Sequence, residues 1–231
     1  MCWNKLRRNI WGARMTLIQL VSLRPDDNPP QSAVKYLPEW YKKAKKYHET
    51  GESTYKNCVP FFDGMSSGYV FTAPCDVTFY LENGTPKVGL PEGYEDFVSH
   101  RSPMGDFQVP DGYYPEHFAW FPRWGLRTPP GYSVLYTTPL NGFSLPFIDA
   151  SGIINNDKVF IPGSMPFFLK KNFEGVIEKG TPYVQAIPFK RENWTSEVVH
   201  ITKDDVGYFK PESDRIKNLY RNDVWERVDY A

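Results

Sequence analysis

Prolines limit the folds open to this chain more than any other feature. The sequence has 21 prolines among 231 residues, more than its 17 glycines. Proline fixes its own backbone angle and has no N–H group to donate, so helix interiors and central strands rarely accommodate it. Short strands joined by proline-containing turns do accommodate it. The composition therefore predicts a mainly β fold.

The spacing of apolar residues indicates the same fold class. From residue 59 to residue 188, short apolar runs alternate with glycine, proline and asparagine, and no helical period is evident. Short strands at such spacing are typical of a β-sandwich or barrel. The runs that we predict as strands are 68–71, 77–81, 132–136, 175–177 and 182–187. Asn83-Gly84 predicts a tight hairpin turn after the second of these runs.

The N-terminal part of the chain predicts an arm, a strand and a helix. Residues 1–14 carry basic residues and no acidic one, which indicates a basic arm. A second methionine, Met15, precedes an apolar, β-branched run that suits a first strand, so Met1 and Met15 both fit as the first residue. A helix is predicted over residues 32–47, with Ser32 as its cap.

The aromatic middle and the C-terminal part predict less regular structure. Residues 89–125 form a long aromatic insertion without a strand pattern, and irregular segments of that length are usually functional or part of an interface. A last strand is predicted at 197–201, followed by a helical tail over 204–228 that is broken near Pro211. The predicted units are a basic arm (1–14), a β-barrel domain (15–200) and a helical C-terminal tail (201–231).

Charge and apolar length argue against two classes of protein. The 27 Lys and Arg residues balance the 27 Asp and Glu residues, whereas dedicated nucleic-acid-binding domains are usually basic. We therefore expect no sequence-specific nucleic-acid partner. No run approaches the ~20 apolar residues that span a bilayer, so we expect no membrane partner. The 3 cysteines cannot all pair, which favours free thiols in a reducing compartment.

The sequence lacks the standard motifs of catalytic and metal sites. It has no glycine-rich phosphate loop, no G-x-S-x-G nucleophile elbow and no H-E-x-x-H pattern. His117 and His200 could in principle join one acidic residue in a facial metal triad, but nothing in their spacing supports this. We predict no catalytic residue, no metal and no cofactor.

Four segments, read in order, resemble the dUTPase / dCTP-deaminase superfamily. They are Ser67–Phe71 with Asp76–Thr78, then Pro129–Tyr132, Asp149–Asp157 and Gly175–Pro188. They are similar to the family's Gly-Tyr-Asp-Leu strand, its Pro-Pro-Gly turn, its Gly-Val-Ile-Asp segment and its Lys-Gly-Asp-x-Ile-Ala-Gln segment. The resemblance spans over half of the chain. It implies a dUTPase-like β-clip, a jelly-roll-like barrel, of a kind that typically forms trimers.

The residues that carry this family's chemistry are replaced. Asn155 stands where the family has its water-activating carboxylate, and an amide cannot act as a general base. Val70 stands where the family has an acid that helps to hold the magnesium-bound triphosphate, and the cationic phosphate loop is absent. The resemblance thus implies the fold without its hydrolysis. The candidate ligand-binding residues of a degenerate pocket are Asp157, Asn155, Tyr132 and Gln185.

A second resemblance suggests a biological context. Most of residues 34–194 resemble a family common in tailed-phage genomes, notably through residues 40–41, 58–65 and 187–194. We therefore expect a non-enzymatic phage structural or assembly protein, such as a virion decoration, neck or tail component. The dUTPase-like resemblance implies that it is a homo-oligomer, a trimer, and we expect it to contact other virion proteins in the virion or the host cytoplasm. The alternatives are a nucleotide or small-molecule binding protein, and a divergent nucleotide hydrolase or metal enzyme that uses Asp157 or the two histidines.

Overall fold

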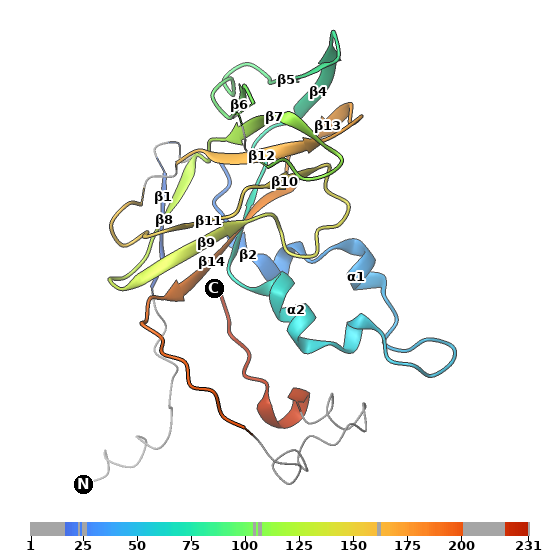
Figure 1. Ribbon diagram of the computed structural model, residues 1–231, viewed down its shortest axis with the longest axis vertical. Coiled ribbons are helices and arrows are strands. Elements are labelled where there is room, and N and C mark those ends of the chain that lie inside the picture. The colour runs from blue at the N-terminus through green and yellow to red at the C-terminus, as the bar shows by residue number, and fades with distance from the viewer. Residues whose placement is uncertain are drawn as a thin grey trace, which may run out of the picture.

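The computed structural model is mainly β: of the residues that it describes, 37% lie in strands and 13% in helices (Figure 1). It describes residues 17–22, 24, 27–103, 105, 108–160, 163–200 and 220–230. Within these ranges the strands form several antiparallel sheets, and none of the sheets closes into a barrel. The predicted fold class is confirmed at that level.

Among the described elements, the helices lie before β3, apart from one turn near the C-terminus. The first half of the chain contains β1 (Gln19–Ser22), β2 (Gln31–Ser32), the 3-10 helix η1 (Ala33–Tyr36), α1 (Glu39–Lys43), the 3-10 helix η2 (Tyr55–Asn57), α2 (Val59–Ser66), β3 (Tyr69–Thr72), β4 (Val77–Glu82), β5 (Thr85–Gly89) and β6 (Val98–Arg101). The second half contains β7 (Tyr113–Trp120), β8 (Trp124–Arg127), β9 (Tyr132–Thr137), β10 (Phe147–Asp149), β11 (Gly152–Ile154), β12 (Met165–Lys170), β13 (Gly175–Ile177), β14 (Pro182–Lys190) and the π-helical turn η4 (Tyr220–Val224).

The strands of the described residues form two larger sheets and two smaller ones. The five-stranded sheet has the order β11-β9-β14-β3-β2, and the four-stranded sheet has the order β10-β12-β7-β6. A three-stranded sheet, β13-β4-β5, and a pair, β1-β8, complete the set. Figure 1 shows α1 and α2 together at one side of these sheets.

Aromatic side chains from the sheets meet in one apolar core. Trp120 on β7 stacks on Phe167 of β12 with 4.0 Å between ring centroids, and Tyr183 of β14 packs on Trp120 at 5.0 Å. Phe79 of β4 meets Phe118 of β7 edge to face at 5.1 Å. Each fully buried side chain of this size contributes on the order of 1.5–3 kcal/mol relative to an exposed one. The four-, five- and three-stranded sheets therefore share a single core.

The strands that we predicted from apolar runs are confirmed. The five apolar runs correspond to β3, β4, β9, β13 and β14, and the run after Met15 contains β1. The hairpin between β4 and β5 is also confirmed. Asn83 has φ of 52° and Gly84 has φ of 78°, which is the pair of positive angles that a type I′ turn needs.

The predicted helix over residues 32–47 is wrong, because Pro38 interrupts it. A residue before proline is sterically disfavoured in the helical region, and Leu37 is accordingly extended with ψ of 131°. Ser32 ends β2, a short 3-10 helix follows, and α1 begins only after Pro38. A second helix, α2, lies in the stretch that we predicted to lack one. Its proline falls in the first turn, where no N–H group is needed.

The predicted irregular insertion at 89–125 is also wrong, because it forms β6, β7 and β8. Four consecutive residues at the end of β7, 117–120, are all buried. One face of β7 packs into the core, and on its other face Pro103, Gly105 and Val109, from the chain between β6 and β7, lie around the buried His117. A strand buried on both faces has no apolar–polar alternation, so the pattern that reveals half-buried strands is absent.

The last predicted strand, 197–201, is not formed at residues 197–200, which pair with no strand in the described part of the chain. The basic arm (1–14) and most of the predicted helical tail lie outside the described residues. Residues 220–230 return to the body, where Trp225 donates its indole N–H to Asp63 of α2 at 3.0 Å. Within the described ranges, no helix has the length and apolar character needed to cross a bilayer.

Candidate interaction site

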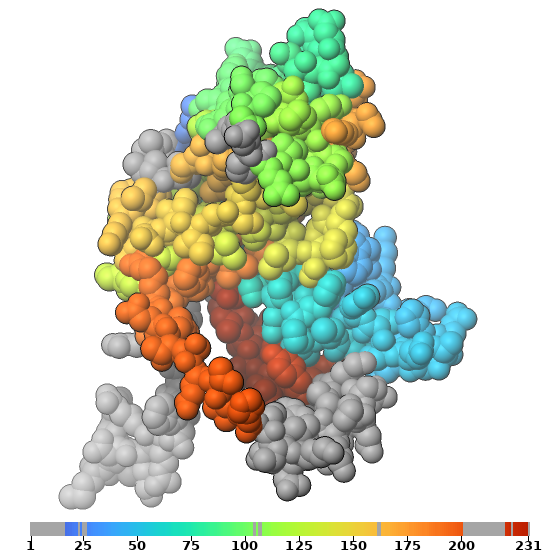
Figure 2. All heavy atoms as spheres, in the orientation of Figure 1, coloured from blue at the N-terminus to red at the C-terminus, as the bar shows by residue number. Residues whose placement is uncertain are grey.

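An extended arm, residues 192–200, leaves the end of β14 and stays largely exposed along its length. It carries apolar side chains that a folded chain usually buries: Trp194 is 85% exposed, Val198 85% and Val199 69%. Figures 1 and 2 show this segment, in orange, leaving the sheets as a separate strip of chain. Exposed apolar groups gathered on one segment mark an interaction site more often than a scattered few do.

The arm is held firmly at its base by Arg191. The Arg191 guanidinium donates to both oxygens of the Asp157 carboxylate, with 2.9 Å between Nη1 and Oδ1. The same nitrogen donates to the Tyr132 carbonyl at 2.9 Å and to Ser133 Oγ at 3.0 Å. The Arg191 backbone N–H donates to the carbonyl of Gly131 at 2.8 Å. We call this group, Gly131, Tyr132, Ser133, Asp157 and Arg191, the anchor.

Asp157 is the central acceptor of the anchor. Its Oδ2 also accepts the backbone N–H of Gly131 at 2.9 Å, and its side chain is only 8% exposed. The hydrogen bonds from Arg191, then that from Gly131, hold the pKa of Asp157 well below its usual range. The carboxylate is therefore ionised at neutral pH, and its oxygens are used to fix the turn before β9 and the start of the arm.

The structure brings three of the four predicted ligand-binding residues together at the anchor. The Asn155 amide oxygen accepts a hydrogen bond from the Ser133 hydroxyl at 2.8 Å. Because Ser133 also contacts Arg191, Asn155 is linked to the anchor through Ser133. Tyr132 takes part through its backbone carbonyl, which also accepts from Thr128 Oγ1 at 3.1 Å. These contacts connect the chain after β11 with the first residues of β9.

The fourth predicted residue, Gln185, lies elsewhere. It pairs with Thr137 at the far end of the β14–β9 ladder, whereas Lys190 pairs with Tyr132. Five residues of strand separate the two positions, or roughly 17 Å. Gln185 is 1% exposed, accepts from the N–H of Leu140 at 2.8 Å and donates to the carbonyl of Ser67 at 2.7 Å. It ties the end of α2 to the sheet. A ligand-binding role for these four residues stays a prediction.

The two histidines weighed as metal ligands are placed very differently. His117 is 4% exposed on β7, whereas His200 is exposed at the end of the arm. Across the described residues, no three His, Cys, Asp or Glu side chains lie together as a metal-binding group.

A second exposed apolar surface lies beside the helices. We call it the aromatic row: Tyr55, Phe61, Trp40 and Phe143. Successive ring centroids along it are 5.3, 6.1 and 6.1 Å apart. Tyr55 is 72% exposed, Trp40 40% and Phe143 76%. Aromatic side chains of this kind are enriched at the centres of protein interfaces.

Sequence reasoning missed both the arm and the importance of Arg191. The residues 197–200 have the composition of a strand, but only the structure shows that no partner strand is present among the described residues. Arg191 directly follows the longest strand, and the planar guanidinium of arginine suits two-pronged pairing with a carboxylate. That signal was available, but the sequence does not say which aspartate it meets.

The comparisons with known proteins place the chain in no family. No family model, no curated protein and no solved structure matches it.

Proposed function

We propose that this chain is a non-enzymatic assembly protein of a tailed-phage particle, whose copies join through the arm into a threefold oligomer. The observation that carries the proposal is the arm: an extended segment with an 85% exposed tryptophan, fixed at its base by a bidentate ion pair. A segment that is held at one end and carries exposed apolar side chains suits exchange between neighbouring copies.

We propose further that the fold is a dUTPase-like, jelly-roll-like β-clip, and the mainly β architecture supports this. The segments that carry the resemblance contain β11 and most of β3 and β14, and they reach the start of β9; these four strands are neighbours in the five-stranded sheet. The same segments also contain β13 and the start of β4, which pair in the three-stranded sheet. At the position where that family activates water, the Asn155 amide oxygen accepts a hydrogen bond from Ser133. Asp157, the acidic residue that this chain retains, is ionised and paired with Arg191. Neither group is placed to activate water in this arrangement.

The energetics favour burial of the arm against another chain. Transfer of one large apolar side chain from water to an interface is worth on the order of 1.5–3 kcal/mol. Trp194, Val198 and Val199 together offer several such side chains to each neighbour. In a closed ring each copy gives one arm and receives one, so the interaction repeats without a free end.

We propose the aromatic row as the surface that receives the arm. Both surfaces expose apolar side chains, and both contain aromatic rings, which pair favourably beyond the area they bury. The residues of the row come from α1, η2, α2 and the chain after β9, and none of them belongs to the anchor.

The test is the mass of the purified full chain by light scattering and native mass spectrometry. We expect a trimer for the natural sequence. We expect the double variant Trp194→Ser with Val198→Ser to shift toward monomer. Val159→Ser is the matched control, because Val159 is also exposed, at 56%, but lies outside the arm.

Two results together would contradict the proposal. One is a monomer at every concentration tested, and the other is the absence of this chain from purified phage particles. A trimer that survives loss of the arm side chains would keep the assembly role and remove the arm from it.

A further inference from the structure

The last described residues, 220–230, dock on the body of the molecule beside α2, and we call them the C-terminal segment (Figure 1). Among the described side chains of this segment, Arg221, Trp225 and Tyr230 are partly buried, and the others are exposed. Three anchoring side chains, four and then five residues apart, therefore hold the segment. Short peptides bound to a protein surface are held in the same way.

Two of these anchors donate hydrogen bonds to acceptors that the body holds in place. Arg221 Nη2 donates to the carbonyl oxygen of Asn57 at 3.0 Å, and Asn57 is itself buried and fixed by its own side-chain hydrogen bonds. Trp225 Nε1 donates to both carboxylate oxygens of Asp63, at 3.0 and 3.2 Å. The Trp225 ring also meets Phe62 edge to face. Hydrogen bonds to charged groups are stronger than neutral ones, so Asp63 is the central acceptor of the docking surface.

The local structure of the segment sets the spacing of its anchors. The backbone N–H of Trp225 donates to the carbonyl of Tyr220 at 2.7 Å and closes the turn η4. Residues four apart on a helical turn lie on one side, which lets Arg221 and Trp225 reach the body together. Tyr230 then packs edge to face on Tyr69 of β3, with 5.9 Å between ring centroids. The surface thus recognises a sequence pattern: an arginine, a tryptophan four residues later and a tyrosine five residues after that.

The C-terminal segment is an addition to the folded body rather than a part of its core. Among the described residues, the apolar core that the sheets share includes none from this segment. Nineteen residues, 201–219, separate the segment from the arm. A chain of that length spans at most roughly 70 Å, about twice the diameter of a small domain. The segment therefore has enough chain to reach the same surface on a neighbouring copy.

We propose that this docking surface is a peptide-binding site, and that in the assembled protein it receives the C-terminal segment of a second copy. Every copy carries both the segment and the surface, so the contacts within one chain form identically between two. When copies are held together, a neighbour's tethered segment is present at a high effective concentration, and exchange costs little free energy. The inference rests on the proposed function only in requiring that copies meet, because it uses neither the arm nor the aromatic row.

The first experiment tests the surface with a fluorescein-labelled peptide of residues 220–231. The receiving protein is the full chain with Arg221→Ala and Trp225→Ala, whose own segment lacks two anchors. We expect the peptide to bind this double variant, as measured by fluorescence polarisation. The natural chain should bind the peptide at least roughly tenfold more weakly, because its own tethered segment competes. The same peptide with Trp225→Ala should also lose at least roughly tenfold in affinity for the double variant.

A further change in the receiving protein tests the central acceptor. Asp63→Ala, added to the double variant, removes the carboxylate and should weaken peptide binding roughly tenfold or more. Asp111→Ala is the matched control, because Asp111 is an exposed acid outside the docking surface. It should leave peptide affinity unchanged.

The second experiment tests exchange between full chains by NMR. One protein is labelled with ¹⁵N and carries Asp63→Ala, so its segment is intact and its own surface is weakened. The other is the unlabelled double variant, whose surface is intact. We expect the indole ¹⁵N–¹H signal of Trp225 to move toward its position in the natural chain when the unlabelled protein is added. Adding unlabelled Asp63→Ala protein should leave that signal in place.

Equal affinity of the double variant for the natural peptide and for its Trp225→Ala form would overturn the proposal, because the surface would then not recognise the segment. A Trp225 signal that ignores the added double variant would overturn exchange between copies. The peptide measurement is separate from the proposed function, since a monomeric chain can still bind the peptide. It also needs changes only in the segment, so it decides the matter even where Asp63→Ala fails to fold.

Discussion

The core and the arm both carry large apolar side chains, but the molecule treats them in opposite ways. Trp120 is fully buried between Phe167 and Tyr183, whereas Trp194 is 85% exposed. The two tryptophans differ in their surroundings: the first lies on a strand with neighbours on both sides, and the second lies beyond the last ladder pair of β14. The difference teaches that composition alone does not separate core residues from large apolar residues that stay exposed in the chain.

The largest effect is expected in the core. Phe167→Ala removes a ring that is fully buried and stacked on Trp120, and leaves a cavity that the rigid sheets cannot close. We expect the free energy of unfolding to fall by about 3–5 kcal/mol. Denaturant unfolding followed by circular dichroism measures this.

Trp194→Ser is the contrasting variant for this measurement. Because Trp194 contacts solvent, its loss should change the unfolding free energy of the monomer by less than about 0.5 kcal/mol. A large destabilisation of the monomer by Trp194→Ser would break the comparison, since the arm would then belong to the folding unit.

A second effect comes from Asp149, a carboxyl group at the edge of the aromatic core. It accepts the indole N–H of Trp120 at 3.0 Å, and its Oδ2 has no partner within the described part of the chain. Burial raises the pKa of Asp149 to about 7. In the unfolded chain this group ionises near pH 4, so between roughly pH 4 and 7 the native state holds a proton that the unfolded state has released.

The stability of the protein should therefore fall as the pH rises through that window, by up to about 1.4 kcal/mol per pH unit from this group. Asp149→Asn keeps an oxygen that can accept from Trp120 and removes the slope. Unfolding curves at several pH values test this, with Asp111→Asn at an exposed position as the control. An unchanged slope in Asp149→Asn would assign the pH dependence to other groups.

The smallest effect on global stability is expected at the anchor. Asp157→Asn removes the charge that Arg191 meets but keeps an oxygen for the N–H of Gly131. We expect the arm to loosen at its base, so trypsin should cut after Lys190 and Arg191 severalfold faster while the core stays intact. Because the pKa of Asp157 is lowered, the natural anchor should hold until the pH falls below the ordinary range of an aspartate. Equal cutting rates in both proteins would show that the ion pair does not hold the arm.

The sequence was informative where local patterns decide the structure. The Asn83-Gly84 turn and strands such as β9 and β14 follow from turn chemistry and apolar spacing, which act over a few residues. It was misleading at β7, whose two covered faces remove the alternation, and at residues 32–47, where Pro38 outweighed an apparently amphipathic stretch. Those outcomes depend on packing and on one steric exclusion.

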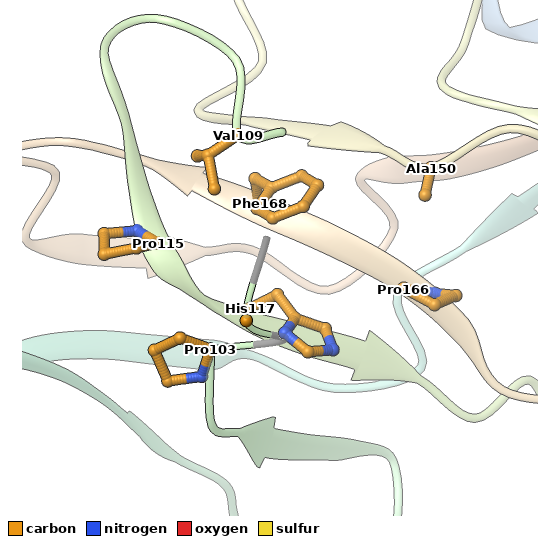
Figure 3. Close-up of a pocket in the computed structure, with 8 residues that line it drawn as sticks. Pro103, Val109, Pro115, His117, Ala150, Pro166 and Phe168 are labelled. Carbon is orange, nitrogen blue, oxygen red and sulfur yellow. The ribbon is translucent and has the colours of Figure 1, made fainter. Parts of the chain in front are cut away.

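The candidate site was predictable in part. Asp157 and Asn155 stood out by their positions in a familiar pattern, and the structure does bring them together with Tyr132. What Asp157 contacts depends on the return of the chain at Arg191, 34 residues later, and what Asn155 contacts depends on Ser133 of β9. Such a long-range pairing is invisible in a single sequence. His117 escaped notice as part of a small pocket for the same reason, because its neighbours there come from β12 and from the chain between β6 and β7 (Figure 3).

The position of the arm at the end of β14 also determines how the molecule would respond to mechanical load. A pull on the arm acts along the axis of β14, which is bonded to β9 on one side and β3 on the other. Antiparallel hydrogen bonds lie perpendicular to the strands, so such a pull shears both ladders at once instead of opening them one pair at a time. Force applied to the arm would therefore be transmitted directly into the five-stranded sheet, the largest sheet among the described residues.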